Sequence, residues 1–449
     1  MLIKSDKTTL KYMAVSGIRG INGSMHYIDT AEGRIIFDAG LDTQRPVESV
    51  AKISHIPYEP HAVFITHAHM DHVGALPELI RSYPSTRVYM TYPTVVLAEV
   101  MLVHSLILRQ KNALEDEDRP SYTLDDLELL FYLFQAQNYK KHFEIHRTPA
   151  LPLNFSFWDA GHILGSAGVM MKWRGKKIFY SGNFRLSDQT ILRGADFPKE
   201  SIDLLIMEAT YGADGKTYSY KNESKRLAEF IETRLKFGGV VLLPVFSLGR
   251  TQELLMNIAM MRRRGQIPAT TIYITGMGTK ITKIYDRLMH KYDRKYPEIK
   301  LRPLAQHLMS RRKIKGPAIV LATSGMMLPQ TYSNDLAQDF MKDPKNGIAF
   351  VGYVSPESPG YALREKAVNQ SFSDYSYSLG GCALESFNFS AHADAQELMQ
   401  LIRQTQPRKI ILCHGEQEAY ESLKRKIEEE MPKIEVLIPE EGKLYDIEL

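Results

Sequence analysis

The sequence predicts a two-domain α/β protein with a parallel sheet covered by helices on both faces. Its 449 residues exceed the roughly 250–300 residues at which a single hydrophobic core usually stops growing. Strands broken by glycines open the chain, whereas strands and amphipathic helices alternate after Lys199. Because strands that alternate with helices are typical of buried parallel sheets, these observations together favour an α/β fold with more than one core.

The first part of the chain combines short strands with three helices. Hydrophobic patterns predict strands at 14–17, 24–29, 34–40 and 62–65. Hydrophobic residues at helical spacing predict helices at 74–81, 94–108 and 124–134. Asp38 ends one of these strands, and two interpretations stay open for it: a carboxylate that orients a neighbouring metal loop, or a turn-forming aspartate.

The remainder of the chain repeats strand and helix. Strands are predicted at 177–180, 204–208, 239–244, 271–274, 318–322, 348–351, 409–413 and 433–439. Helices are predicted at 219–235, 251–262 and 417–431. In the last helix Tyr420, Leu423 and Ile427 share one face, so we expect it to be anchored on the core.

Composition and charge describe an ordinary globular protein. Hydrophobic residues make up 44% and charged residues 24% of the chain, as is usual for globular domains. The net charge of +4 is compatible with a polyanionic substrate. The two cysteines, Cys382 and Cys413, provide no disulfide framework and favour a cytoplasmic location. We find no apolar run that would cross a bilayer and no signal peptide, so we expect no membrane association.

The residues with the clearest chemistry form a dense histidine motif. His67, His69, Asp71 and His72 lie within seven residues, directly after the strand at 62–65. Imidazole and carboxylate ligands suit Zn²⁺, and a turn after a strand can direct alternate side chains to two neighbouring metals. An isolated histidine more often serves packing or hydrogen bonding, but this density favours metal binding. The distant ligand candidates are His162 and His414.

The motifs together resemble a known family. The stretch from Thr66 to Gly74 resembles the metal loop of the metallo-β-lactamase superfamily. Further motifs occur in the order found in β-CASP nucleases: Glu208-Ala209-Thr210-Tyr211-Gly212, Pro244 to Arg250, Ser324-Gly325-Met326, Phe350 to Tyr353, Phe389 to Asp394 and Cys413-His414-Gly415-Glu416. The chain is similar to the branch that contains the catalytic nuclease subunit of the eukaryotic cleavage and polyadenylation factor and short prokaryotic RNases.

This resemblance implies an architecture. Residues 1–201 and 382–449 would form an αββα metallo-β-lactamase sandwich, and residues 202–381 would form an inserted, doubly wound β-CASP domain. The active site would lie in the cleft that joins the two domains. The accessory C-terminal domain of ribonuclease J is not expected, which favours endonucleolytic rather than 5′-exonucleolytic cleavage.

The resemblance also implies roles for individual residues. His67, His69 and His162 would bind one Zn²⁺, and Asp71, His72 and His414 would bind the second. His392 would be the general acid, Glu208 the carboxylate that orients it, and Asp71 is included among the catalytic residues. Asp38 would orient the metal ligands without binding a metal ion itself.

The substrate implied by the resemblance is single-stranded RNA. RNA-processing members carry histidine at the position of His414, whereas the DNA-repair branch usually has an apolar residue there. Arg250, Ser324 and Ser390 are the expected substrate-binding residues. Further basic groups that would follow the phosphate backbone are Lys280, Lys283, Arg311, Arg312, Lys313 and Lys315, although the cluster near Arg311 is equally typical of a solvated loop.

One position departs from the family pattern. Members usually have Ser/Thr-Gly-Asp after the strand at 177–180, and that aspartate bridges the two zinc ions; here the motif is Ser181-Gly182-Asn183. An amide offers one neutral oxygen where a carboxylate offers two anionic ones. Because two close cations repel, we expect incomplete or unequal metal occupancy. A weak natural member, altered metal occupancy and an engineered substitution all remain open as explanations.

Three functions therefore remain under consideration. The first is a zinc-dependent ribonuclease whose activity Asn183 reduces or abolishes. The second is a non-catalytic RNA-binding scaffold that pairs with a second copy or a related β-CASP protein, motivated by Asn183 and by Met327 to Gln330, which replace the glycines usual after Ser-Gly-Met. The third is a small-molecule hydrolase such as a lactonase, which would leave the inserted domain without an RNA-related role.

Overall fold

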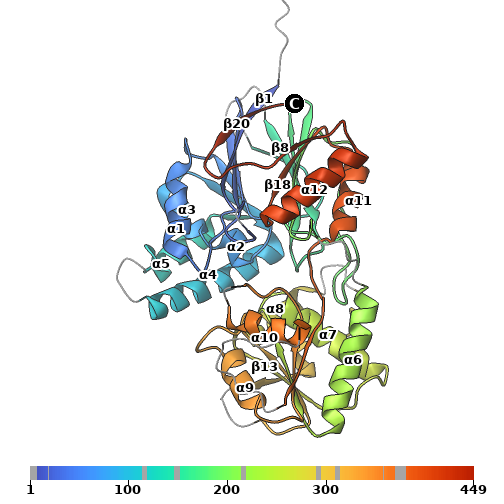
Figure 1. Cartoon of the computed structure of the whole chain (residues 1–449). Coiled ribbons are helices and arrows are strands. Elements are labelled where there is room, and N and C mark those ends of the chain that lie inside the picture. Colours follow the sequence, from blue (N-terminus) through green and yellow to red (C-terminus); the bar gives the residue numbers. More distant parts are fainter. Residues whose placement is uncertain are drawn as a thin grey trace, which may run out of the picture. The chain divides into compact units, whose positions relative to one another are not determined.

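The structure is a computed structural model that describes residues 8–18, 20–113, 119–145, 152–213, 219–289, 295–308, 314–356, 358–369 and 381–449. The chain forms two compact units. The first comprises Met1–Ser187, Gly194–Thr217 and His392–Leu449, and the second comprises Asp188–Arg193 and Tyr218–Ala391. Each unit has its own hydrophobic core, and both are mixed α/β structures (Figure 1).

The first unit contains two seven-stranded sheets. One has the order β20-β1-β2-β3-β4-β5-β6, with β20 Leu444–Glu448, β1 Thr9–Ser16, β2 Met25–Asp29, β3 Arg34–Phe37, β4 Ala62–Phe64, β5 Arg87–Thr91 and β6 Phe134–Gln137. The other has the order β19-β18-β11-β10-β9-β8-β7, with β19 Glu435–Leu437, β18 Lys409–Cys413, β11 Leu204–Glu208, β10 Lys176–Tyr180, β9 Ala167–Trp173, β8 Leu153–Asp159 and β7 Phe143–Ile145. Each sheet is mixed: its antiparallel strand pairs lie beside parallel pairs, with β3 and β10 at the change.

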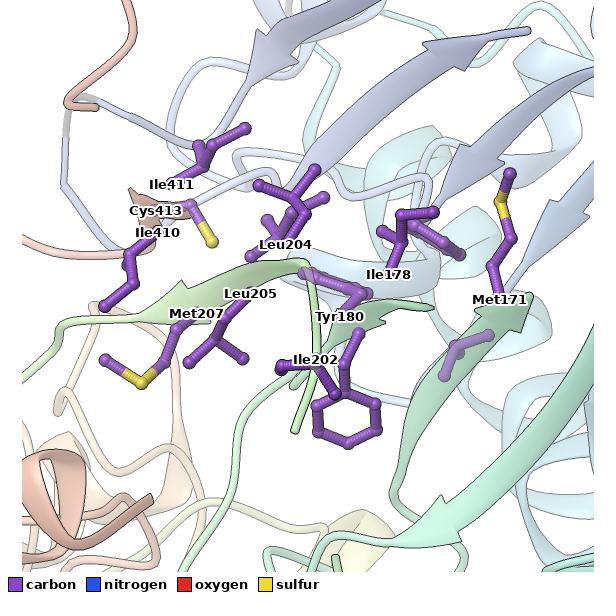
Figure 2. Close-up of a cluster of buried hydrophobic side chains, with 14 of the residues drawn as sticks. Met171, Ile178, Tyr180, Ile202, Leu204, Leu205, Met207, Ile410, Ile411 and Cys413 are labelled. Carbon is purple, nitrogen blue, oxygen red and sulfur yellow. The ribbon is translucent and has the colours of Figure 1, made fainter. Parts of the chain in front are cut away.

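The core of the first unit lies between these two sheets. Phe37 and Phe64 of the first sheet share one buried cluster with Phe155 and Ile206 of the second. Figure 2 shows part of this cluster, where side chains of the neighbouring strands β10, β11 and β18 pack together. Cys413 belongs to it and is buried, so its sulfur serves the core as predicted.

Helices cover the outer faces and complete an αββα sandwich (Figure 1). The first sheet carries α1 Pro46–Ala51, α2 Met70–Val73, α3 Leu76–Ser82, α4 Tyr92–Asn112 and α5 Leu124–Tyr132; the second carries α11 Ala395–Thr405 and α12 Gln417–Glu430. The predicted anchoring of the last helix is confirmed, because Tyr420, Leu423 and Ile427 are fully buried.

Helix α4 corrects one expectation. By length and composition, Tyr92–Lys111 would be apolar enough to cross a membrane, whereas the sequence pattern suggested that no segment would. In the structure this helix buries Leu97 and Leu102 in the first unit, and Arg109 pairs with Glu78 of α3 at 2.8 Å. Its apolar face is therefore used for packing on the first sheet.

The second unit is built on one parallel sheet of six strands. Its order is β14-β13-β15-β12-β16-β17, with β14 Gln306–Leu308, β13 Thr271–Thr275, β15 Ala318–Ala322, β12 Val240–Pro244, β16 Gly347–Phe350 and β17 Ala383–Ser386. The flanking helices are α6 Tyr220–Lys236, α7 Arg250–Arg263, α8 Gly276–Leu288, α9 Tyr332–Phe340 and α10 Pro359–Asn369. Because β12 is internal and later strands join on both sides of it, this is the predicted doubly wound arrangement.

The predicted domain boundaries differ from these units. The segment 202–381 was expected to be the inserted domain, yet β11 pairs with β10 and β18 in the first unit. Likewise β17 pairs with β16 in the second unit, although residues from 382 onward were expected in the sandwich. A buried strand followed by an amphipathic helix looks alike in either domain, because hydrophobic patterns do not reveal which strand is the neighbour.

Candidate metal centre

The histidine motif follows strand β4, as the sequence predicts, and its last residues form the short helix α2, which precedes the predicted helix near 74–81. Asp38 holds the start of the motif, since its carboxylate accepts hydrogen bonds from the backbone N–H and the hydroxyl of Thr66 at 2.7 and 2.9 Å. His69 precedes the first residue of α2 in extended backbone. Side chains of the extended part and of the first helical turn thus project in different directions, which divides the motif between two ligand clusters.

The first cluster consists of His67, His69 and His162. Their ligand nitrogens lie close together: His67 Nε2 is 3.1 Å and His162 Nε2 is 3.2 Å from His69 Nδ1. His67 and His162 are buried. Burial and then the neighbouring imidazoles lower the pKa of His67 well below its usual range, so its ring stays neutral and keeps a lone pair for a metal.

The loop that carries His162 is held by a serine. Ser166 Oγ accepts hydrogen bonds from the backbone N–H groups of His162 and Ile163 at 3.1 and 3.2 Å. The segment from Asp159 to Ser166 therefore closes on itself and places His162 against the loop that follows β4.

The second cluster consists of Asp71, His72 and His414. His414 Nε2 is 3.3 Å and His72 Nε2 is 3.5 Å from Asp71 Oδ2. His414 follows strand β18, and its backbone N–H donates to the carbonyl of Gly17 at 3.0 Å. Burial opposes a charge on Asp71, but His72, His414 and His69 outweigh it and lower the pKa of this carboxyl.

Asp38 also contacts the second cluster. Its Oδ2 accepts hydrogen bonds from His72 Nδ1 at 2.7 Å and from the hydroxyl of Tyr180 at 2.8 Å. Burial works against protonation of His72, but Asp38 and Asp71 prevail and raise its pKa. Of the two open interpretations of Asp38, its contacts favour the one in which it orients a metal ligand, because a carboxylate behind a histidine fixes its tautomer.

Asn183 faces the second cluster with its amide nitrogen. Its Nδ2 is 2.9 Å from His72 Nε2 and 3.4 Å from His414 Nε2. Its Oδ1 is buried and has no hydrogen-bond partner among the described residues. The preceding Gly182 has a φ of 54°, and a Cβ there would lie 2.9 Å from Thr66 Cβ, so a glycine is needed to bring this loop against the metal motif.

A carboxylate–imidazole pair stands beside the clusters. His392 Nδ1 donates to Glu208 Oε2 at 2.7 Å, and Glu208 Oε1 accepts the backbone N–H of Phe184 at 2.7 Å. Glu208 is buried, whereas His392 remains 19% exposed, enough to be reached from solvent. Burial raises the pKa of Glu208, but His392, His414 and Thr210 together lower it, so the carboxyl is anionic and can orient the imidazole.

Two residues in these contacts were missed by the sequence reasoning. The hydroxyl of Thr210 lies 3.0 Å from His414 Nδ1 and 3.3 Å from His392 Nδ1, and it donates to Glu208. Tyr180 bonds Asp38. Thr210 lies in the quoted Glu208-Ala209-Thr210 motif, which was a usable signal; a tyrosine in a hydrophobic strand gives none.

The expected substrate-binding residues lie in the second unit. Arg250 is the first residue of α7 and follows β12, Ser324 follows β15, and Ser390 follows β17. All three therefore follow the carboxyl ends of parallel strands, where open α/β sheets usually bind ligands. Their substrate contacts stay predictions, and the basic residues Arg311, Arg312 and Lys313 lie outside the described residues.

The donor sets fit metal ions. The ligand atoms of each cluster lie within 4.8 Å of one another. A tetrahedral Zn²⁺ with bonds of about 2.0–2.1 Å would place its ligand nitrogens about 3.3–3.4 Å apart, close to the spacing in the first cluster. Glu208, His392 and His414 also lie within 4.8 Å, but Glu208 and His392 are joined by a hydrogen bond and His414 already belongs to the second cluster. An αββα sandwich with two such clusters defines a centre of the metallohydrolase type.

Three domain families match the chain. A metallo-β-lactamase superfamily domain matches residues 27–209, a β-CASP domain matches 251–363, and a Zn-dependent metallo-hydrolase RNA specificity domain matches 381–439. The first match includes β11, in agreement with its place in the first unit.

Similar proteins cover almost the whole chain. An RNase J-like protein of Methanocaldococcus jannaschii is 30% identical over 91% of this chain and 92% of its own length. Ribonuclease TTHA0252 of Thermus thermophilus is 30% identical over 91% of this chain and 94% of its own. A crystal structure of a protein of unknown function from Enterococcus faecalis is 14% identical over 98% of this chain and all of its own, with a TM-score of 0.56, and shares the fold.

The chain belongs to the β-CASP family of the metallo-β-lactamase superfamily. The resemblance seen in its motifs is therefore confirmed, as are the metallo-β-lactamase and β-CASP domains.

Proposed function

We propose that this protein is a zinc-dependent ribonuclease that hydrolyses phosphodiester bonds within single-stranded RNA. The supporting observation is the convergence of both ligand clusters and the Glu208–His392 pair in one unit. The relatives named as ribonucleases, and the match to an RNA specificity domain over residues 381–439, support RNA as the substrate. A cytoplasmic location belongs to this proposal, since Cys382 and Cys413 are buried free thiols.

Different side chains would bind the two metal ions and support the metal ligands. His67, His69 and His162 would hold one zinc ion, and Asp71, His72 and His414 the other. When bound, zinc supplies Lewis acidity for the activation of water and for the charge that develops on phosphate. Asp38 and Thr210 keep the imidazoles of His72 and His414 in position, a support that commonly changes metal affinity or activity by about 10–100-fold.

His392 would protonate the leaving oxygen. An RNA alkoxide is a poor leaving group, and an imidazolium is a suitable proton donor near neutral pH. The contact between Nδ1 and Glu208 fixes the ring, so the proton would leave from Nε2. Glu208 stays charged and holds the imidazole in the orientation from which the transfer would start.

Asn183 would weaken this chemistry at the second cluster. Its Nδ2 faces His72 Nε2 and His414 Nε2, so a hydrogen-bond donor lies where family members place an anionic oxygen. We expect the first cluster to keep its ion more tightly, because its three nitrogens have no such competitor. The Asp71 charge favours the second cluster, but it does not replace the missing bridge.

The deciding experiment compares the protein with Asn183→Asp, using Asn183→Ala as the matched control. Asn183→Asp should raise the zinc content per chain, measured by plasma mass spectrometry. It should also raise the rate of cleavage of a single-stranded RNA by at least about 10–100-fold. Asn183→Ala removes the competing amide but supplies no anionic oxygen, so it should raise cleavage far less than Asn183→Asp does. Chelation should abolish cleavage by Asn183→Asp. Failure of Asn183→Asp to cut RNA with any of several divalent metals would reject the nuclease proposal.

The second candidate is the RNA-binding scaffold without catalysis. Asn183 favours it, as does the loop after Ser324, where Met327 and Gln330 have positive φ of 54° and 63° without glycine. This candidate predicts salt-dependent RNA binding, no turnover even as Asn183→Asp, and association with a second copy or a related β-CASP protein, visible by light scattering.

A further inference from the structure

The second unit contains a basic pocket that the metal chemistry does not use. Its volume is about 650 Å³, and it lies at the carboxyl end of β13, where the chain enters helix α8. The walls come from α8, from the short helix Arg302–Leu304 and from β14. We define the basic pocket by six of its lining residues: Thr279, Lys280, Lys283, Arg302, Gln306 and His307.

The charge of the basic pocket is unbalanced. Lys280, Lys283 and Arg302 line it with their side chains exposed, and the described residues of its lining include no aspartate or glutamate. Among the described residues these three cations form no ion pair, whereas Lys225 and Lys236 on helix α6 pair with glutamates on their own helix. Unpaired cations gathered in one concavity attract anions more strongly than scattered ones.

The walls are held by specific contacts. The hydroxyl of Thr279 and His307 Nδ1 lie 2.7 Å apart and connect α8 to β14. Asp286 accepts the backbone N–H groups of Leu301 and Arg302 at 2.7 and 2.8 Å. This carboxylate fixes the segment that presents Arg302, so the cations are presented by a connected framework.

The chemistry of the basic pocket fits phosphate groups. Arginine, lysine, threonine and glutamine side chains and helix N-termini are the usual partners of nucleic-acid phosphates. Among the described residues the lining contains no phenylalanine, tyrosine or tryptophan on which a base could stack, and its one imidazole, that of His307, contacts the hydroxyl of Thr279. It therefore offers mainly positive charge and hydrogen-bond donors, which are the usual partners of phosphate groups.

We propose that the basic pocket binds the phosphodiester backbone of single-stranded RNA and contributes sequence-independent affinity. This inference rests on the proposed ribonuclease function. The location supports it, because Arg250, Ser324 and Ser390 follow the carboxyl ends of other strands of the same parallel sheet, and that edge is the common ligand-binding edge of open α/β sheets.

The test measures RNA binding by fluorescence anisotropy with a labelled single-stranded RNA, in chelator so that no RNA is cut. The variants are Lys280→Gln/Lys283→Gln and Arg302→Gln, and the matched control is Lys225→Gln/Lys236→Gln, which removes two lysines from the same unit. The double pocket variant should bind on the order of tenfold more weakly at low salt. Its slope of log K against log salt should fall by about 1.4, which corresponds to two lost contacts with single strands. The control should change neither quantity.

Two outcomes would overturn the proposal. Unchanged affinity and salt slope in both pocket variants would show that RNA does not contact the basic pocket. Stabilisation by inorganic phosphate or a mononucleotide that the pocket variants lose, with RNA affinity unaltered, would identify a small-anion site instead. If Asn183→Asp cleaves RNA while the pocket variants bind normally, only this inference fails; if the protein neither binds nor cleaves RNA, the proposed function fails with it.

Discussion

The two ligand clusters differ in what surrounds them. The first has three imidazoles, one of them kept neutral by burial, and no carboxylate among its ligands. The second has the Asp71 carboxylate, is supported by Asp38 and Thr210, and meets the amide nitrogen of Asn183. The second cluster is thus the one that Asp38 and Thr210 support and also the one that the amide of Asn183 contacts. Support around a ligand and the ability to hold an ion are separate properties, and the clusters allow them to be tested separately.

The largest expected effect comes from removing one imidazole from each cluster. His67→Ala should lower the zinc affinity of the first cluster by more than about 100-fold. The loss of a metal ligand weakens binding more than the loss of a contact that only supports a ligand, which costs about 10–100-fold. His414→Ala should change the zinc content less, since Asn183 already weakens the second cluster. Plasma mass spectrometry after dialysis measures both. A larger loss in His414→Ala would reverse the ranking of the two clusters.

A smaller effect is expected from the carboxylate behind His72. In the Asn183→Asp background, Asp38→Asn should weaken zinc binding at the second cluster by about 10–100-fold, because His72 loses the acceptor that fixes its Nδ1 proton. The first cluster should retain its affinity. Titration with a competing zinc indicator separates the two sites, and equal weakening of both would mean that Asp38 acts on the fold of the loop rather than on His72.

Acid should destabilise the protein through His26, whose pKa is lowered to about 3 by burial and then by the charges of His72 and His414. Because its pKa is about 6.5 when unfolded, the unfolded chain binds this proton more readily below that pH. The folded state therefore loses stability as pH falls from 6.5 toward 3, by about 2 kcal/mol between pH 7 and pH 5.

Urea unfolding in chelator checks this dependence on pH. Between pH 7 and pH 5, His26→Gln should lose about 2 kcal/mol less of its free energy of unfolding than the unaltered protein loses. Tyr12→Phe serves as the control, because it removes the hydroxyl that lies 2.9 Å from His26 Nδ1 and keeps the histidine. Parallel slopes in the protein and in His26→Gln would show that this histidine does not couple to folding.

The smallest effect concerns Thr210, which contacts both His414 and His392. In the Asn183→Asp background, Thr210→Val should lower kcat by about 5–10-fold, corresponding to about one hydrogen bond of 1–1.5 kcal/mol. Thr210→Ser keeps the hydroxyl and should restore most of the rate. If Thr210→Ser is as slow as Thr210→Val, the methyl group and packing matter rather than the hydroxyl.

Local sequence was sufficient to indicate a metal-binding motif and many of the elements. The ligands from His67 to His72 are close in sequence, so their spacing after β4 already indicated metal binding. In the parallel unit the central strands β12, β13, β15 and β16 and the helices α6 and α7 were predictable because hydrophobic periodicity is a local property, whereas α8, α9, α10, β14 and β17 were not predicted. The departure at Asn183 was also visible, since it is a change of residue type at one position of a motif.

Tertiary structure alone decided which strands are neighbours and which side chains meet. Strand β11 belongs to the sandwich because it pairs with β10 and β18, a pairing that its hydrophobic residues do not specify. The contacts of Tyr180 with Asp38 and of Thr210 with His414 join residues more than a hundred positions apart. Such contacts depend on sheet register and core packing, which the whole chain determines together. The basic pocket has the same origin, because Lys280 and Arg302 line one concavity only after α8 and β14 have taken their places.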